Sequence, residues 1–325
     1  MTAPSLVAAV GASAADHPRL LALIERARGR AAAEPVLPTI AVVYPCDKLA
    51  LEVARHMAGV GLARPLLIGA PALIERAAAA AGIELAGLDV EATGDEPCAA
   101  AQRAVELARA GRVQALMKGS LHTDELLSAV VHRETGLRTG RRISHVFVFD
   151  LPRYPKLLAL ADCAVNIAPD LNTKCDILSN AVDLLCRIGI AQPKVGVVAA
   201  VETVNSAIPA TVDAQALVAM ARQGAWPQAI VEGPFGFDNA ISAEAARIKK
   251  IDSRIAGDVD LLIVPDLNSG NMLYKSFNYI GGGDCAGLVV GARVPVVLTS
   301  RADSALSRIA SVALAVLAGI DAPRC

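Results

Sequence analysis

The chain has 325 residues, of which 54% are hydrophobic and 19% charged, so it is long enough for two domains or one large one. Its formal net charge of −1 argues against nucleic acid or an anionic membrane as the main partner. Its seven cysteines form no Cys-x-x-Cys pair, which disfavours a zinc site or a disulfide framework and fits a reducing compartment. No apolar run reaches the ~20 residues of a membrane span, and no signal peptide is recognisable, so we expect a cytoplasmic protein.

The first half of the chain alternates predicted strands and helices. Short apolar runs predict strands at 39–44, 65–68, 89–92 and 113–117. Apolar residues at helical spacing predict helices at 17–33, 48–60, 71–81, 97–110 and 124–133. This alternation is typical of a doubly wound parallel sheet with right-handed crossovers.

The basic, glycine-containing stretch 136–142 interrupts this pattern and predicts a domain boundary. Beyond it, strands are predicted at 143–150, 164–168, 195–201, 229–232, 261–264 and 287–290, and helices at 175–188, 213–222 and 272–279. Residues 294–299 and 305–317 form one more β-α unit that resembles those of the first half. We therefore predict a discontinuous first α/β domain, 1–142 with 291–325, and a second α/β domain, 143–290.

Motifs of several enzyme classes are missing from the sequence. It contains no G-x-x-x-x-G-K-[ST], no H-E-x-x-H and no G-x-S-x-G, which disfavours P-loop hydrolases, zinc peptidases and serine hydrolases. No predicted strand is followed by G-x-G-x-x-G, which weakens the case for a dinucleotide-dependent dehydrogenase. We expect neither a bound metal nor a redox cofactor.

Ser300 lies where the last predicted strand ends and the last predicted helix begins. Ligands of open α/β sheets bind at this edge, and a helix N-terminus there suits an anion. Arg301 adds a planar donor fork that matches phosphate. The same residues also fit a plain helix start, with Ser300 and Asp303 as a capping box and Arg301 in solvent.

Other polar clusters follow predicted strands and together describe a cleft edge suited to a phosphorylated ligand. They are Lys118-Gly119-Ser120, Asn166, Glu202-Thr203 and the stretch from Asp266 to Asn271. From the sequence alone, Lys118 and Lys275 could equally be ordinary surface charges.

Eight short motifs occur in an order that resembles the phosphate acetyl/butyryltransferase family, and most of all its phosphate butyryltransferase branch. They span roughly Val113 to Ala318 and are M-K-G-S (117–120), G-L-R-T-G-R-R-I-S-H-V (136–146), N-I-A-P-D-L (166–171), V-E-T-V-N (201–205), A-T-V-D-A (210–214), E-G-P-F-G-F-D-N-A-I (232–241), G-N-M-L-Y-K (270–275) and L-T-S-R-A-D-S (298–304).

The resemblance implies the reaction acyl-CoA + phosphate ⇌ acyl phosphate + CoA, with coenzyme A as a substrate and without a metal or redox cofactor. It also implies a fold like that of the isocitrate/isopropylmalate dehydrogenases, with two doubly wound α/β domains and an interdomain cleft. The family is usually a homodimer, and we expect the same here.

By the same resemblance, Ser300 and Arg301 match the active-site pair, with Arg301 on the phosphoryl group and Ser300 beside the thioester. The implied substrate-binding residues are Lys118, Gly119, Ser120, Asn271, Lys275 and Arg141.

The sequence departs from the acetyl-transferring branch at two positions. The Asp proposed there as the base for the CoA thiol falls at Ser307, and Asp303 is the only carboxylate nearby. A capping carboxylate should be acidic and a poor base, so the base stays unassigned. An arginine of that branch also lacks a clear counterpart, with Arg138, Arg141 and Arg142 as substitutes.

Two alternative functions remain open at this point. One is an NAD(P)- and metal-dependent decarboxylating dehydrogenase of the same fold. The other is a non-catalytic module that binds CoA or acyl phosphate. An intact Ser300-Arg301 pair favours the acyltransferase, acting by direct attack of phosphate on the thioester.

Overall fold

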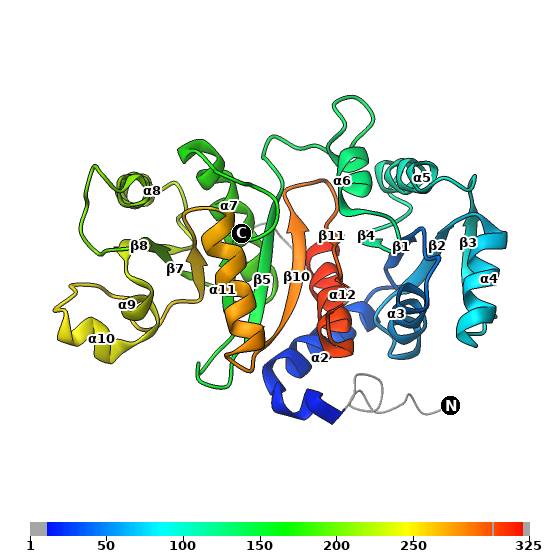
Figure 1. Cartoon of the computed structure of the whole chain (residues 1–325), viewed down its shortest axis with the longest axis horizontal. Helices are drawn as coiled ribbons and strands as arrows, with labels where there is room; N and C mark the ends of the chain where they lie inside the picture. The colour runs from blue at the N-terminus through cyan, green and yellow to red at the C-terminus, as the bar shows by residue number, and fades with distance from the viewer. Residues whose placement is uncertain (1–11, 301, 321–325) are drawn as a thin grey trace. The chain divides into compact units, whose positions relative to one another are not determined.

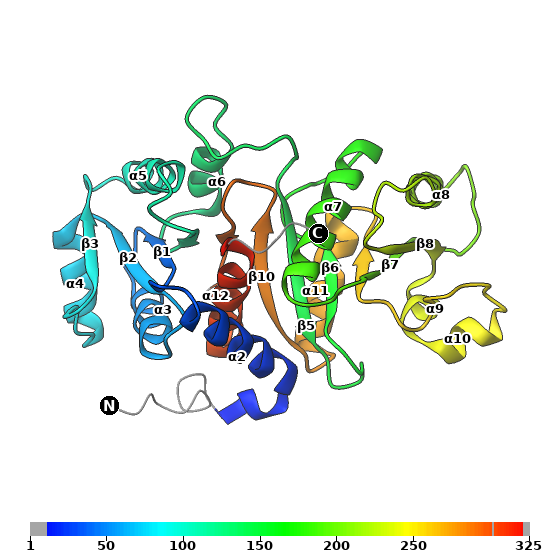
Figure 2. The same cartoon turned by 180° about the vertical axis from the view of Figure 1, so that it is seen from behind.

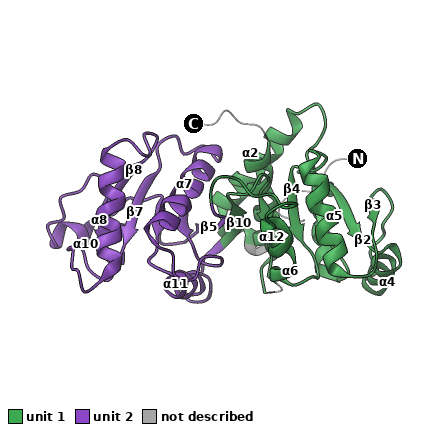
Figure 3. Cartoon of the chain, turned by 90° about the horizontal axis from the view of Figure 1, so that it is seen from above, with its two compact units in different colours: residues 1–141, 285–322 green, residues 142–284, 323–325 purple. Residues whose placement is uncertain are grey.

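The computed structural model describes residues 12–300 and 302–320, which divide into two compact units. Unit 1 takes its described residues from 1–141 and 285–322, and unit 2 takes its residues from 142–284 (Figure 3). Each unit is built from strands and packed helices (Figures 1 and 2). Among the helices that the structure describes, none is long and apolar enough to cross a membrane.

Unit 1 contains a mixed sheet with the strand order β3-β2-β1-β4-β11-β10. Its strands are β1 (Thr39–Val43), β2 (Arg64–Gly69), β3 (Asp89–Ala92), β4 (Ala115–Lys118), β10 (Asp284–Val290) and β11 (Val296–Val297). The first five in the order run parallel, whereas β10 is antiparallel to β11. The prediction of a purely parallel sheet was therefore wrong at this edge, because β10 and β11 are joined by a short hairpin-like connection.

Seven helical segments surround this sheet: η1 (Ala12–Asp16), α2 (Pro18–Ala32), α3 (Lys48–Gly59), α4 (Pro71–Ala81), α5 (Pro97–Arg109), α6 (Thr123–Val131) and α12 (Ala305–Gly319). The chain moves outward from β1 through β3 and then returns past β1 to β4. Right-handed crossovers therefore place α3 and α4 on one face of the sheet and α5 on the other. Helix α12 packs against α2 and α3, and α5 packs against α6.

Helix α12 is the buried centre of unit 1, with every residue from Leu306 to Leu317 buried. Two of its hydroxyls hold β10: Ser307 Oγ donates to the Cys285 carbonyl at 2.5 Å, and Ser311 Oγ accepts the Gly287 N–H at 2.9 Å. These contacts place β10 in unit 1, although the sequence analysis assigned residues up to 290 to the second domain. The domain boundaries themselves stay a prediction.

Unit 2 contains a second mixed sheet, ordered β5-β6-β9-β7-β8. Its strands are β5 (Ser144–Asp150), β6 (Leu158–Ala161), β7 (Lys194–Val198), β8 (Ile230–Phe235) and β9 (Leu261–Ile263). Strands β5 and β6 are antiparallel, and the other pairs are parallel. Its helices are α7 (Leu171–Arg187), α8 (Pro209–Arg222), α9 (Phe237–Ile241), α10 (Ala243–Ile248) and α11 (Leu267–Tyr279).

The strand predicted at 164–168 was wrong, because the strand of this region is β6 at Leu158–Ala161. Asp162 ends β6 and turns the chain: its carboxylate accepts the backbone N–H groups of Ala164, Val165 and Asn166 at 2.9–3.1 Å. A backbone whose donors are bound to one side chain cannot also form a strand ladder.

The last β-α unit also differs from the prediction. Only Val296–Val297 of the apolar run pairs as a strand, and α12 begins at Ala305. Its cap is Ser304, whose side chain accepts the Ser307 N–H at 2.9 Å. The alternative in which Ser300 caps this helix was therefore wrong, because Ser300 lies several residues before its start.

Replacing Ser304 with alanine should destabilise the protein by about 1 kcal/mol, the usual effect of losing a helix cap. Ser300→Ala should change stability by less than about 0.5 kcal/mol, because Ser300 is exposed and caps no helix. Urea unfolding of both variants provides the comparison. A larger loss for Ser300→Ala than for Ser304→Ala would contradict this assignment.

Candidate active site

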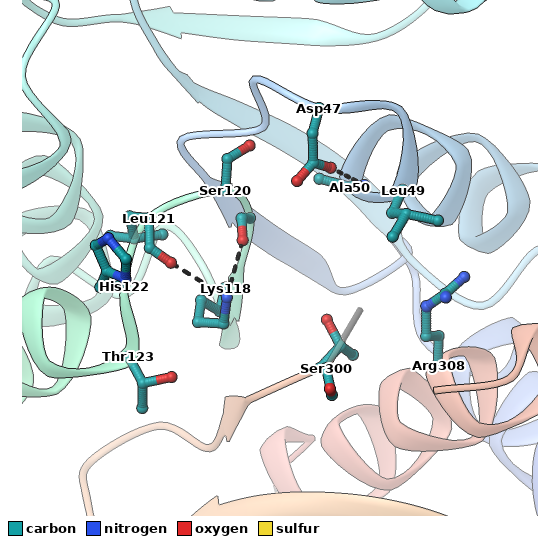
Figure 4. Close-up of a pocket in the computed structure, with 12 residues that line it drawn as sticks. Asp47, Leu49, Ala50, Lys118, Ser120, Leu121, His122, Thr123, Ser300 and Arg308 are labelled. Atoms are coloured by element: carbon teal, nitrogen blue, oxygen red, sulfur yellow. Dashed lines mark hydrogen bonds between the residues drawn. The ribbon is translucent and has the colours of Figure 1, made fainter. Parts of the chain in front are cut away.

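A pocket of about 260 Å³ lies in unit 1, just beyond the carboxyl ends of β1, β4 and β11. It is lined by Asp47, Leu49, Ala50, Lys118, Gly119, Ser120, Leu121, His122, Thr123, Thr299, Ser300 and Arg308 (Figure 4). This is the edge at which open α/β sheets bind their ligands. The structure thus brings together four of the predicted site residues, namely Lys118, Gly119, Ser120 and Ser300.

Three helices have their N-terminal turns at this pocket. Asp47 caps α3 by accepting the Ala50 N–H at 2.9 Å, and the His122 N–H that precedes α6 donates to Glu125 Oε2 at 2.7 Å. Arg308 lies in the first turns of α12. Because the positive ends of three helix dipoles meet here, the pocket favours an anionic ligand.

Lys118 supplies a positive charge at the end of β4. Its Nζ donates to the carbonyls of Gly119 and Leu121, both at 3.1 Å, which holds the ammonium group beside the pocket. The next side chain, Ser120, also lines the pocket, and its buried Oγ has no hydrogen-bond partner within the described residues. A buried hydroxyl without a partner is uncommon in proteins and is consistent with a ligand contact.

Gly119 allows the ends of β1 and β4 to approach closely. Its N–H donates to the Val43 carbonyl, and the Ser120 N–H donates to the Tyr44 carbonyl, both at 2.9 Å. A Cβ atom at position 119 would lie 2.5 Å from Val43 O and 2.6 Å from Tyr44 O. The glycine of the M-K-G-S motif is therefore explained by backbone packing, and it positions Lys118 and Ser120.

Ser300 lies in a tight turn at the pocket edge. Its N–H donates to Asp303 Oδ2 at 2.6 Å, and its Oγ accepts the Ala302 N–H at 3.3 Å. Ser300 lies between Lys118 and Arg308 in the view of Figure 4. Arg301, its predicted partner, lies outside the described residues.

Arg308 was missed by the sequence analysis. It lies on α12, its side chain is 9% exposed, and its Nη2 donates to the Asp303 carbonyl at 2.6 Å. A usable signal was present, because Arg308 is the one charged residue in the apolar run from Leu306 to Leu317. Asp47, His122 and Thr123 were missed as well, since a polar residue after a strand is common in any α/β protein.

The position of the proposed thiol base is occupied by Ser307, which is buried and does not line the pocket. The carboxylate of Asp303 accepts the Ser300 N–H, consistent with a role in the turn. Cys46, beside Asp47, is no better candidate for chemistry: burial, with a smaller effect of Asp47, raises the pKa of its thiol to about 11.

Three predicted substrate-binding residues lie outside this pocket. Arg141 is exposed on the connection that follows α6, and it does not line the pocket. Asn271 and Lys275 lie on α11 in unit 2. There Asn271 Nδ2 donates to the Cys163 carbonyl at 3.4 Å, while Lys275 is exposed.

In unit 2 the predicted site residue Asn166 is hydrogen-bonded to other residues of that unit. Asn166 Nδ2 donates to Asp162 Oδ2 at 2.6 Å and to the Ile143 carbonyl at 2.9 Å. Burial lowers the pKa of His145 to about 4, although the nearby Asp162 carboxylate acts in the opposite direction. His145 is therefore neutral at pH 7, and its packing against Phe147 indicates a core residue.

Comparison with known proteins gives consistent matches. A family model described as phosphate acetyl/butaryl transferase matches residues 95–316. The phosphate acetyltransferase of Rhizobium meliloti is 49% identical over 288 residues, which cover 88% of this chain and 91% of that protein. The phosphate butyryltransferase of Clostridium acetobutylicum is 38% identical over 280 residues, covering 86% of this chain and 92% of that protein.

A solved structure agrees with these sequence matches. The crystal structure of a branched-chain phosphotransacylase from Enterococcus faecalis V583 matches with a TM-score of 0.77 at 30% identity, covering 88% of this chain and 100% of that chain.

Replacing Gly119 with alanine should destabilise the protein by about 1–3 kcal/mol, because the added methyl group meets the backbone carbonyls of Val43 and Tyr44. Gly140→Ala is a matched control, since nothing lies within 4 Å of a Cβ atom there. Denaturant unfolding measures both. Equal stability of Gly119→Ala and the parent protein would contradict the close approach.

Proposed function

The chain belongs to the phosphate acetyl/butaryl transferase family, and we propose that the pocket of unit 1 is where its acyl transfer takes place. The family expected from the eight motifs is thereby confirmed. The protein is an acyltransferase that moves a short acyl group between coenzyme A and inorganic phosphate. The observation that carries the location is the meeting of Lys118, Arg308 and Ser300 at one sheet edge where three helices begin.

The chemistry sets three requirements for such a site. A phosphate oxygen attacks the thioester carbonyl carbon, the carbon–sulfur bond breaks, and the CoA thiolate leaves as acyl phosphate forms. The protein must neutralise phosphate, stabilise the oxyanion of the tetrahedral intermediate and hold both reactants. In our proposal Arg301 binds the phosphoryl group, Ser300 lies beside the thioester, and Lys118, Gly119 and Ser120 line the phosphate side.

We propose direct transfer in a ternary complex. Within the described residues no histidine or carboxylate hydrogen-bonds the Ser300 hydroxyl, which such a group would have to activate before it could attack. The raised pKa of Cys46 keeps that thiol protonated at neutral pH. Neither residue therefore has the surroundings of an acyl-enzyme nucleophile.

The remaining parts of the proposal rest on the family resemblance. Asn271, Lys275 and Arg141 are proposed as substrate contacts. The finer description of the fold is two doubly wound domains with a cleft, as in isocitrate/isopropylmalate dehydrogenases. We also propose a homodimer in the cytoplasm.

The acyl group is proposed to lie between acetyl and butyryl. The acetyltransferase of Rhizobium meliloti shares more identity with the chain than the butyryltransferase of Clostridium acetobutylicum, whereas the motifs most resemble the butyryl branch. Acetyl-CoA is therefore the first substrate to test. One methylene discriminates by only about 1–3 kcal/mol, so neighbouring chain lengths should also react.

The two alternative functions are not favoured. A decarboxylating dehydrogenase requires a divalent metal, and no group of three or more metal-binding side chains occurs in the described part of the chain. A non-catalytic binding module conflicts with the names of the related enzymes, which describe catalysts.

The test is release of free thiol from acyl-CoAs of two to six carbons, with and without phosphate. We expect phosphate-dependent release that persists in EDTA and needs no nicotinamide. A stoichiometric burst of thiol without phosphate would replace direct transfer by an acyl-enzyme. Metal-dependent, NAD(P)-linked oxidation of a hydroxy acid would overturn the proposed function.

Arg301→Ala should lower kcat/KM by at least about 100-fold, because a charge-assisted contact is worth more in the transition state than in the ground state. Arg301→Lys should recover only part, since lysine keeps the charge and loses the fork. Steady-state kinetics and melting temperature are measured on both. Near-normal turnover of Arg301→Ala would remove this loop from the mechanism.

A further inference from the structure

We propose that Arg308 is a second phosphoryl-binding cation of the pocket, additional to Arg301. The inference rests on the proposed function, because it names a further residue that the same site uses to hold phosphate. It also explains why the charge of Arg308 is buried, which the fold alone does not explain.

The first observation is the burial of a charge without a counter-charge. Arg308 is only 9% exposed, and it forms no ion pair within the described residues. Among the described residues it makes one hydrogen bond, from Nη2 to the Asp303 carbonyl, although a guanidinium group has five N–H donors. A buried charge that is not paired costs the folded protein a large free energy, so the missing anion is expected from a ligand.

The second observation is independent and comes from the other side of the pocket. Ser120 lines the same pocket, and its Oγ is buried without a hydrogen-bond partner in the described residues. In Figure 4 Lys118 and Ser120 lie on one side of Ser300, and Arg308 lies on the other. The oxygens of a phosphoryl group are bound by donors of this kind: a guanidinium group, an ammonium group and hydroxyl groups around one space.

The charge and the volume of the pocket both suit a phosphoryl group. Two cations, Lys118 and Arg308, face one carboxylate, Asp47, whose Oδ1 accepts the Ala50 N–H. Ligand pockets for larger molecules measure about 300–1,000 Å³, whereas this one has about 260 Å³. It therefore fits a phosphoryl group better than a whole coenzyme.

The phosphoryl group has two possible sources. One is inorganic phosphate or acyl phosphate, and the other is a phosphate group of coenzyme A. The recognising chemistry is the same for both, so separate kinetic measurements must identify the source.

A purely structural role makes a different prediction. Arg308 holds the Asp303 carbonyl, and the Asp303 carboxylate holds the Ser300 N–H. If this turn were its only task, Arg308→Met would lower the melting temperature and kcat while leaving the KM for phosphate unchanged.

The experiment uses Arg308→Met, which keeps the length of the side chain and removes the charge. Without phosphate it should melt at or above the parent temperature, because an unpaired buried charge has been removed. Inorganic phosphate should raise the melting temperature of the parent but not of the variant. The KM for phosphate should rise about 10- to 150-fold, the effect of losing a charged hydrogen bond.

Arg109→Met is the matched control, since Arg109 also donates to backbone carbonyls, those of Glu134 and Gly136, but does not line the pocket. It should retain the phosphate response. Arg308→Lys should give an intermediate KM, and it replaces Arg308→Met as the reporter if the latter fails to fold.

The source of the phosphoryl group follows from comparing the KM for phosphate with that for acyl-CoA and acyl-dephospho-CoA. An increase confined to acyl-CoA, and absent with the dephospho form, would assign Arg308 to a coenzyme phosphate. Unchanged KM values for all three, with an unchanged phosphate-induced shift, would overturn the proposal. The melting shift needs no turnover, so it tests Arg308 even if the parent protein transfers no acyl group.

Discussion

The close contact between the ends of β1 and β4 is the constraint on which the site depends. Two hydrogen bonds, from Gly119 to Val43 and from Ser120 to Tyr44, continue the parallel pairing beyond the strands themselves. They leave no room for a side chain at position 119. As a consequence, the loops that lead into α3 and α6 start side by side, and the positive ends of both helices face one small volume.

Helix α12 contributes Arg308 to the same volume, and it is bonded directly to the sheet. Its hydroxyls at Ser307 and Ser311 are bonded to the backbone of β10, and its apolar residues fill the core between α2 and α3. Arg308 is therefore carried by a rigid element, whereas Ser300 is carried by a turn.

The sequence predicted the order of strands and helices well because most elements are long apolar patterns, such as β1 and α12. The predicted strand at 164–168 was wrong because the Asp162 side chain binds the backbone after β6. The start of α12 was ambiguous because both Ser300 and Ser304 are suitable cap residues, and the cap is Ser304. The Lys118–Ser120 loop and Ser300, which line the pocket, were predicted at the sheet edge because they follow predicted strands. Arg308 was not, because its helical position concealed that it faces a pocket rather than solvent.

Family motifs alone do not separate residues that bind substrate from residues that hold the fold. Asp213 belongs to the A-T-V-D-A motif, and Lys174 lies three residues after N-I-A-P-D-L. The two form a 2.6 Å ion pair in which the lysine is buried, so each charge is neutralised by the other. Arg308 lies in a region of the same family match, but its buried charge has no such partner within the described residues. A buried charge that the protein itself neutralises has a structural explanation, whereas one without a counter-charge is costly and leads us to propose a ligand. This difference, more than membership of a motif, is the physical reason for assigning phosphate to the pocket of unit 1.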